Sequence, residues 1–259
     1  MNWQKGESLR KYAHEYGDDI RVNTKAIIVA AGSSSRMQGH GKRLDKQFAE
    51  IAGRPLLAWT IEAFQNAPSV NEIFLILSQE NILMGRELVN RYGFSKVTGA
   101  WIGGTERKDS VSIGLALAEG SDIIAVHDGA RPCITSTDIE RGISLVRDDG
   151  LPAAVAVSPI IDTIKAIVRI EHKGEERMLF TGTVDREALV AASTPQIFNA
   201  RTLKIAHSRF RKYTATDDAQ LVELIGEEVF GYECTSWNGK VTRQEDLVIA
   251  EAVLLKRKS

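Results

Sequence analysis

Small residues directly follow an apolar segment near the start of this 259-residue chain. Ala30 ends the segment, Ala31 and Gly32 follow it, and three serines and Arg36 come next. Small side chains let backbone N–H groups approach a phosphate closely, and an arginine can neutralise its charge. The loop matches neither the Walker A pattern nor GxGxxG, so a plain tight turn is the alternative interpretation.

Cations continue beyond that loop. Lys42, Arg43 and Lys46 follow Arg36, with Asp45 as the acid among them. The whole chain has 33 Lys and Arg against 34 Asp and Glu, a net charge of −1, so this cluster is a local excess. A triphosphate needs several cations aimed at one place. The cluster therefore indicates a polyphosphate site, with a solvated charged loop as the alternative.

A glycine-rich loop offers a second candidate site. Gly103, Gly104 and Thr105 run into an expected helix, with Thr105 as its N-cap. Paired glycines allow backbone atoms to contact a flat base, or they only shape the turn.

A third candidate site follows the apolar segment Ile123–Val126. Ligands of open α/β sheets bind at the carboxyl ends of the strands, where Asp128 and Arg131 would lie. Asp128 could bind a hydroxyl or Mg²⁺, and Arg131 a phosphate, while an internal ion pair is the alternative. His127 alone is interpreted as a hydrogen-bonded structural histidine.

The expected elements alternate between strands and helices. Apolar runs predict strands buried on both faces at Ala26–Ala30, Ile73–Leu77, Ile123–Val126 and Ala153–Val157. Amphipathic segments predict helices at 56–67 and 107–119 and from Thr137, where Thr137 and Glu140 would form a capping box. This alternation predicts an α/β fold with a mostly parallel twisted sheet flanked by helices. At this length, one large domain and two smaller ones are equally consistent with the sequence.

The pattern changes near Pro159. From there the chain alternates around the polar turn His172–Glu176, which predicts a protruding β-arm at about 159–185. Further helices are expected at Asp185–Ala192, Ala200–Lys212 and Asp217–Gly226, and a strand at Val229–Cys234. A final helix would start at a capping box of Thr242 and Glu245, with Val248, Ala252 and Leu255 on its packed face.

Composition excludes several classes of protein. With 43% hydrophobic and 26% charged residues the chain is typical of soluble globular proteins. It is too apolar to be disordered and too neutral to wrap nucleic acid. No run approaches the roughly 18 apolar residues of a membrane span. Cys133 and Cys234 are too few and too far apart for a disulfide framework, which favours the cytoplasm.

Residues 1–24 are expected to form an N-terminal extension without the apolar core of a signal peptide. A helical face of apolar residues predicts a helix packed on its own domain, with a docking helix as the alternative. That face comprises Leu9, Tyr12, Ala13, Tyr16 and Ile20.

Taken together, these motifs resemble the 2-C-methyl-D-erythritol 4-phosphate cytidylyltransferases, from Lys25 to about Leu255. The matching stretches are AAGSSSRM (30–37), KQF (46–48), GGTERKDSV (103–111), VHDGARP (126–132), DTIK (162–165), TVDR (183–186), TPQIF (194–198), TDDA (216–219) and KVTRQEDL (240–247). The resemblance implies that 25–259 form one nucleotidyltransferase domain, a single Rossmann-like domain. The sequence departs from the family at Asp45, where proline is usual.

The resemblance implies a reaction. CMP would pass from CTP to 2-C-methyl-D-erythritol 4-phosphate, giving pyrophosphate and 4-diphosphocytidyl-2-C-methyl-D-erythritol in the non-mevalonate route to isoprenoids. The attacking phosphate is already an anion, so catalysis would rest on positioning and charge neutralisation. Mg²⁺ would bridge the phosphates and keep waters, with no protein ligand assigned.

The resemblance also implies site residues. Arg36, Lys46, Arg186 and Lys240 would be catalytic. Ala30, Ala31, Gly32, Gly104, Thr105, Ser110 and Gly129 would bind the nucleotide. Asp128, Arg131, Thr163, Thr194 and Thr216 would bind the second substrate. Arg186 follows the expected arm, which in the family is exchanged across a homodimer, so a homodimer is expected.

Other functions are considered beside this one. A ribitol 5-phosphate cytidylyltransferase would share the fold and chemistry, but the TDDA segment at 216–219 favours methylerythritol phosphate. A Rossmann dehydrogenase would need GxGxxG after the first strand. A non-catalytic nucleotide-binding regulator would not need Arg36, Lys46, Arg186 and Lys240.

Overall fold

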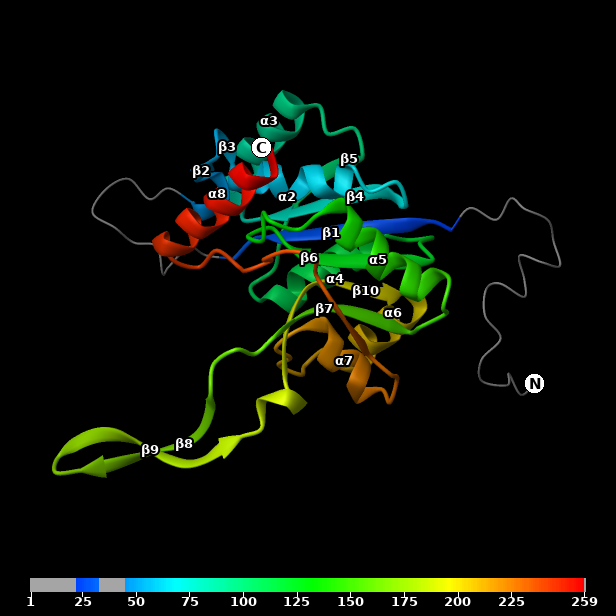
Figure 1. Ribbon diagram of the computed structural model, residues 1–259. Helices are drawn as coiled ribbons and strands as arrows, with labels where there is room; N and C mark the ends of the chain where they lie inside the picture. The colour runs from blue at the N-terminus through cyan, green and yellow to red at the C-terminus, as the bar shows by residue number, and fades with distance from the viewer. Residues whose placement is uncertain (1–21, 33–44, 259) are drawn as a thin grey trace, which may run out of the picture.

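The computed structural model describes residues 22–32 and 45–258 (Figure 1). Most of the predicted N-terminal extension, residues 1–21, and the predicted catalytic residue Arg36 lie outside the described residues.

The structure defines strands, helices and short 3₁₀ turns along these ranges. The strands are β1 (Thr24–Ala30), β2 (Glu50–Ile51), β3 (Arg54–Pro55), β4 (Val70–Leu77), β5 (Val97–Ile102), β6 (Ile123–Asp128), β7 (Ala153–Pro159), β8 (Ile164–His172), β9 (Glu175–Val184), β10 (Val190–Asn199) and β11 (Phe230–Glu233). The helices are α2 (Leu56–Gln65), α3 (Ile82–Tyr92), α4 (Arg107–Leu117), α5 (Ser136–Arg147), α6 (Ala200–Arg209), α7 (Asp218–Leu224) and α8 (Gln244–Lys258). The 3₁₀ turns are η2 (Lys46–Phe48), η3 (Gln79–Asn81) and η4 (Arg186–Ala188).

One mixed sheet organises the described chain. Its seven strands there run in the order β11-β7-β10-β6-β1-β4-β5. Strand β1 is parallel to both β4 and β6, and β4 is parallel to β5, whereas β10 is antiparallel to β6 and β7. This arrangement confirms the predicted mostly parallel α/β sheet.

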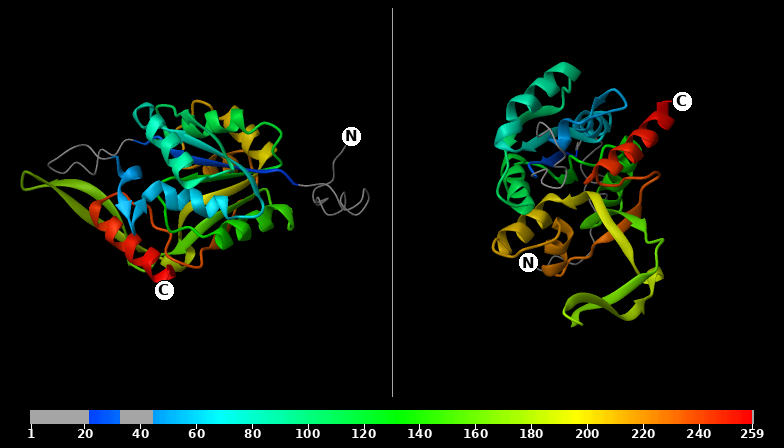
Figure 2. Two further views of the ribbon diagram at one scale, coloured as in Figure 1. Left: turned by 90° about the horizontal axis from the view of Figure 1, so that it is seen from above. Right: turned by 90° about the vertical axis from the view of Figure 1, so that its left-hand side faces the viewer.

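The sheet is buried on both faces because its central strands are apolar on both sides. In β1, Ala26 and Ile28 pack in one core, while Ile27 and Val29 pack in the other. Helices α2, α3 and α5 contribute to the first core, and α4, α6 and α7 to the second. Figure 2 shows the helices packed around the sheet. The parallel strands therefore end together at one edge, where their following loops can meet.

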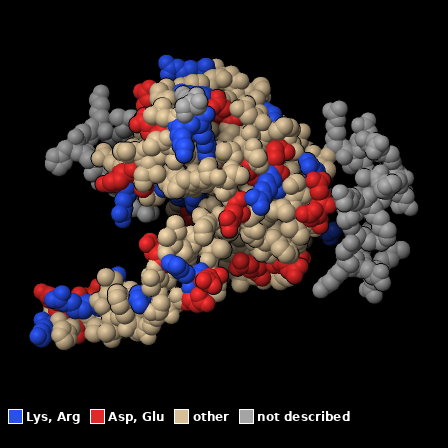
Figure 3. All heavy atoms as spheres, in the orientation of Figure 1, with Lys and Arg blue, Asp and Glu red and all other residues tan. Residues whose placement is uncertain are grey.

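The predicted arm is present. Strands β8 and β9 pair only with each other and project away from the rest of the described chain (Figure 1). Lys173 and Gly174 both have positive φ, as a two-residue turn between right-twisted strands requires. Figure 3 shows both signs of charge along the arm, where Arg169 pairs with Glu176 at 2.8 Å. Apolar Phe180 is also exposed there. A lone hairpin is marginally stable, so the arm needs a further surface to pack on.

The prediction of a helix at Asp185–Ala192 is wrong. Only Arg186–Ala188 form a short 3₁₀ turn, and the chain then enters the long strand β10. This strand pairs with β7 from Val190 and with β6 from Gln196, so pairing on both sides outweighs local helical pattern. Strand β5 (Val97–Ile102) was not predicted, because glycine and polar residues interrupt its apolar run.

The other predicted elements are confirmed: strands β1, β4, β6 and β7 are longer than predicted, and helices α2, α4, α6 and α7 are shorter. Three predicted helix caps are wrong. Helix α5 is capped by Thr135, whose Oγ1 accepts from the Asp138 N–H at 3.1 Å, so the Thr137 box does not form. Helix α4 is capped at Glu106, and not at Thr105, with Asp109 completing the box. In the first turn of α8, Oδ2 of Asp246 accepts the backbone N–H of Thr242 at 2.7 Å, a role predicted for Glu245.

The predicted packed face of the last helix is also wrong. Val248 is 69% exposed, and Ala252 and Leu255 are exposed as well. Ala250 and Leu254 instead pack against Val241 and Ile51. The helix is apolar on more than one side, so periodicity alone could not select the buried stripe. No helix within 22–32 and 45–258 combines the length and apolarity that a membrane crossing requires.

Gly114 of α4 is predicted to be intolerant of a side chain. A Cβ there would lie 2.5 Å from Cγ2 of Ile27 in β1. Alanine within a helix normally stabilises by about 1 kcal/mol relative to glycine. We expect Gly114→Ala instead to destabilise by about 1–3 kcal/mol through overpacking. Gly182→Ala is the control, because no atom lies within 4 Å of the added carbon. An unchanged unfolding free energy for Gly114→Ala would contradict the packing of α4 on β1.

Candidate active site

Loops from three parts of the sheet edge enclose one pocket. They follow β1, β5 and β6, and the turn η2 and the segment before α8 complete its wall. Its lining includes the predicted site residues Ala31, Gly32, Lys46, Gly104, Thr105, Ser110, Asp128 and Lys240. Residues far apart in the sequence are thus brought together at the carboxyl ends of parallel strands, as predicted.

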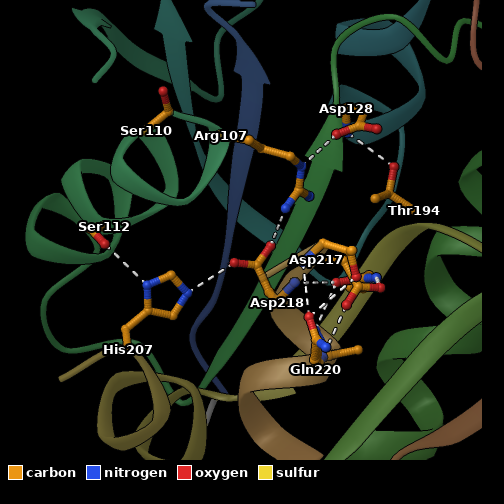
Figure 4. Close-up of polar contacts among 12 residues, drawn as sticks. Arg107, Ser110, Ser112, Asp128, Thr194, His207, Asp217, Asp218 and Gln220 are labelled. Atoms are coloured by element: carbon orange, nitrogen blue, oxygen red, sulfur yellow. Dashed lines mark hydrogen bonds and ion pairs between the residues drawn. The ribbon is translucent and has the colours of Figure 1, made fainter. Parts of the chain in front are cut away.

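Asp128 is the last residue of β6, and Figure 4 shows its contacts with Arg107 and Thr194. Its residue surface is 6% exposed. Oδ1 accepts from Nε of Arg107 at 3.0 Å, and Oδ2 lies 2.9 Å from Nζ of Lys240. Nε of Arg131 is 3.6 Å from Oδ2. The Asp128 backbone N–H donates to Oγ1 of Thr194 at 3.0 Å. Three cations therefore face one carboxylate.

These cations determine the protonation of Asp128. Burial acts to raise its pKa, but the positive charges of Arg107, Lys240 and Arg131 outweigh burial and hold the pKa well below its ordinary value. The carboxylate is ionised at neutral pH. It can orient cations or accept hydrogen bonds, and it cannot serve as a general acid.

Arg107 is a residue of this site that the sequence reasoning did not single out. Its Nη1 donates to Oδ2 of Asp218 at 2.6 Å while its Nε holds Asp128. Burial lowers its pKa, yet the two carboxylates outweigh that effect and raise it. A signal did exist in the sequence: Arg107 is the first residue of α4, where the helix dipole disfavours a cation. An arginine there needs acidic partners.

A buried chain of hydrogen bonds continues behind Arg107 (Figure 4). Asp218 is 1% exposed, and its Oδ1 lies 2.9 Å from Nε2 of His207. Nδ1 of His207 in turn lies 3.0 Å from Oγ of Ser112. Burial acts to raise the pKa of Asp218, but Arg107 and the hydrogen bond from His207 lower it below its ordinary value. The chain joins α7, α6 and α4 behind the pocket.

The glycine-rich loop after β5 packs too closely against its neighbours to admit side chains at Gly103 and Gly104. A Cβ at Gly103 would lie 2.5 Å from Cβ of Ala31, and one at Gly104 would lie 2.3 Å from Cβ of Asp109. Ser110 Oγ accepts from the Gly104 N–H at 3.1 Å and holds the loop over α4. These glycines let the loop after β5 reach the small-residue loop after β1.

Two residues predicted to bind the nucleotide, Ala30 and Gly129, lie beneath the pocket and do not line it. Ala30 is buried, and a Cβ at Gly129 would lie 2.8 Å from the Ala30 Cβ. The Gly129 carbonyl accepts from Oγ1 of Thr60 at 3.0 Å. Both residues therefore shape the floor of the site.

Arg131 and Thr194 connect the pocket to the segment before Lys240. Nη1 of Arg131 donates to the carbonyl of Asn238 at 2.7 Å, and Nδ2 of Asn238 donates to the carbonyl of Thr194 at 2.7 Å. Arg131 and Lys240 also line a neighbouring hollow with Ser158, Ala192 and Trp237. That hollow lies where β7 and β10 lead into the arm.

The remaining predicted residues lie apart from the pocket lining. Thr163 and Arg186 are exposed at the base of the arm, where Arg186 Nη1 donates to the carbonyl of Ile161. The Thr216 N–H donates to Oε1 of Gln220 at 2.9 Å, next to α7. Within one copy of the described chain, these three are not brought together with Lys46.

The surroundings of His127 indicate a structural role. It is fully buried, its ring lies 5.1 Å from that of Phe64, and its Nε2 is 3.3 Å from the Arg131 carbonyl. Burial lowers its pKa to about 3, so it is neutral at physiological pH. This agrees with its interpretation as a hydrogen-bonded structural histidine. Across the described ranges, no group of three His, Cys, Asp or Glu side chains is suited to hold a metal.

Known proteins resemble this chain over nearly all of its length. The family model for 2-C-methyl-D-erythritol 4-phosphate cytidylyltransferase matches residues 24–256. The protein of that name from Dehalococcoides mccartyi strain CBDB1 is 42% identical over 231 residues, which cover 89% of this chain and 96% of the relative.

Solved structures show the same fold. The 2-C-methyl-D-erythritol 4-phosphate cytidylyltransferase of Thermus thermophilus has a TM-score of 0.66 at 31% identity, covering 90% of this chain and 98% of that one. The 4-diphosphocytidyl-2C-methyl-D-erythritol synthase of Anaerococcus prevotii has a TM-score of 0.75 at 25% identity, covering 90% and 96%.

Removing the Asp218 charge is predicted to destabilise the fold in a pH-dependent way. Its pKa in the folded protein lies below the ordinary 3.8, so its stabilisation is complete above that pH and is lost as pH falls through the folded pKa. We expect Asp218→Asn to cost about 3 kcal/mol at pH 7, because Arg107 loses a buried partner. Thermal unfolding should show a deficit at pH 7 that narrows below about pH 4. Exposed Asp149→Asn is the control. A deficit that persists unchanged at pH 3 would contradict the ion pair.

Proposed function

Because this chain belongs to the 2-C-methyl-D-erythritol 4-phosphate cytidylyltransferase family, we propose that it transfers CMP from CTP to 2-C-methyl-D-erythritol 4-phosphate. The products are pyrophosphate and 4-diphosphocytidyl-2-C-methyl-D-erythritol. One observation supports the assignment of the reaction to this pocket. The loops at Gly32 and Gly104, together with Lys46 and Lys240, line a single pocket at the carboxyl ends of β1 and β6.

The chemistry needs charge stabilisation more than proton transfer. A phosphate oxygen of the second substrate attacks the α-phosphorus of CTP, the bond to the bridging oxygen of the β-phosphate breaks, and pyrophosphate leaves. The attacking oxygen is already anionic at neutral pH, so no general base is required. Negative charge grows on the α-phosphate and the leaving group. Fixed cations lower the barrier by stabilising that charge.

Lys46 and Lys240 are the described pocket lysines suited to that role. Lys240 is half-exposed and is oriented by Asp128 at 2.9 Å. The backbone at Ala31 and Gly32 would hold the triphosphate, joined by Arg36. Gly104, Thr105 and Ser110 would contact the cytosine, with Gly129 and Ala30 beneath them.

The second substrate would lie toward the neighbouring hollow. Arg131 and Lys240 line both the region of Asp128 and that hollow, and their charges suit a phosphate. Thr194 and Thr216 would support this side of the site. Asp128 would accept hydroxyl hydrogen bonds only at its remaining lone pairs, since three cations already contact it.

A homodimer with exchanged arms would complete the site. The arm base holds Thr163 and Arg186 away from the pocket of its own chain, and the arm leaves apolar side chains such as Met178 and Phe180 exposed. A second copy would cover that apolar surface and receive Arg186 at its own pocket. This arrangement accounts for the separation of Arg186 from Lys46.

Mg²⁺ is proposed to enter with CTP. Two carboxylates line the described pocket: Asp128, whose oxygens are already engaged by cations, and Glu106, whose side chain caps α4. The residues therefore do not fit an all-protein magnesium site, and the ion would be held mainly by phosphate oxygens and water. When bound it would neutralise phosphate charge. We also propose a cytoplasmic location, because Cys133 and Cys234 are both free thiols.

The substrate is tested by pyrophosphate release. Purified protein with Mg²⁺ and CTP is expected to release pyrophosphate when 2-C-methyl-D-erythritol 4-phosphate is added. With ribitol 5-phosphate, kcat/KM should be lower by at least about 10³-fold, because hydrogen-bonding sites reject mismatched polyols. Release with ribitol 5-phosphate alone would identify a ribitol 5-phosphate cytidylyltransferase instead.

Arm exchange is tested by mixing two inactive variants. Lys46→Ala should lose about 10²–10³ in kcat, as for a lost oxyanion-hole donor, and Arg186→Ala should lose use of the second substrate. If arms exchange, a mixed dimer has one pocket with both residues intact, so unfolding and refolding the two variants together restores activity. Each variant refolded alone is the control. Dimers that form but stay inactive would show that Arg186 serves its own chain.

A further inference from the structure

The turn that carries Lys46 is fixed by the residue before it. Oδ1 of Asp45 accepts from the Gln47 N–H at 3.1 Å, and the Asp45 carbonyl accepts from the Phe48 N–H at 2.9 Å. Asp45 is thus the N-cap of η2. A capping carboxylate of this kind holds a short turn in one conformation.

The second oxygen of Asp45 connects this turn to the N-terminus of α3. Oδ2 accepts from Nδ2 of Asn81, which lies at the end of η3 after β4. Asn81 is 5% exposed and occupies the N-cap position of α3. Asparagine at that position usually accepts a backbone N–H of its own helix, but this side chain makes no such bond. It is directed to Asp45 instead.

The residue after Lys46 provides another anchor. Gln47 is buried, and its Oε1 lies 3.2 Å from the place a Cβ of Gly129 would occupy. Gln47 therefore packs against the loop that follows Asp128. The backbone of Lys46 is held between an attachment to the start of α3 and one to the loop after β6.

We propose that Asp45 and Asn81 are positioning residues that place Lys46 for the transfer reaction, and this inference rests on the proposed function. Neither side chain lines the pocket, whereas Lys46 does. A lysine has a long flexible stem, so the position of its backbone limits where its ammonium can be held. A displacement of about 1 Å at a reacting centre can cost 10²-fold in rate.

The first test is Asn81→Ala. We expect kcat for pyrophosphate release to fall roughly 10- to 100-fold, while KM for CTP stays within about twofold, because Lys46 would act chiefly in the transition state. Asn90→Ala is the matched control, since Asn90 is exposed on the same helix. A kcat for Asn81→Ala within about twofold of the unaltered enzyme would overturn the proposal.

Exchanging the carboxylate and the amide between positions 45 and 81 distinguishes a positioning role from a general loss of structure. Asn81→Asp places two carboxylates together and should lower kcat at least as far as Asn81→Ala. Adding Asp45→Asn should restore kcat to within a few-fold of the unaltered enzyme. The amide introduced at position 45 can donate to the carboxylate at position 81 and still accept the Gln47 N–H. Failure of this second change to restore kcat would contradict the proposed bond.

A double-mutant cycle tests whether Asn81 acts on the reaction through Lys46. In a Lys46→Ala background, Asn81→Ala should cause little further loss of kcat, because its effect passes through the missing lysine. An equal loss in both backgrounds would show a separate structural role and overturn the proposal. Absence of pyrophosphate release by the unaltered enzyme would instead contradict the proposed function itself, so the two failures are distinguishable.

Discussion

The buried charge of Asp128 is the constraint on which the site depends. A carboxylate at the end of a central strand is costly to bury unless cations face it. Here Arg107 comes from the start of α4, Arg131 from the loop after β6, and Lys240 from the segment before α8. Balancing one charge therefore draws three segments of the chain to the same strand end.

Hydrogen bonds through helices α4, α6 and α7 hold Arg107 in this arrangement. Arg107 is held by Asp218 of α7, which is held by His207 of α6, which contacts Ser112 back on α4 (Figure 4). The same helices bury the second core of the sheet. Packing and electrostatics are thus coupled, because a shift of α6 or α7 would alter the hydrogen bonds of Arg107 and, through it, of Asp128.

The sequence predicted what depends on local pattern. Apolar runs located β1, β4, β6 and β7, and small residues after β1 located the loop at Gly32. It did not predict β10, because that strand is defined by pairing with β6 and β7 and not by its own periodicity. Arg107 was overlooked for a similar reason. Its role depends on Asp218, which lies 111 residues away and only the fold brings near.

The most direct measurement is a crystal structure with Mg²⁺ and CTP bound. The triphosphate is expected against the backbone of Ala31 and Gly32, with Nζ of Lys46 within hydrogen-bonding distance of a phosphate oxygen. The ion pair between Arg107 and Asp128 should persist. CTP bound outside this pocket, or bound with Lys46 directed away from its phosphates, would contradict the assignment of the site.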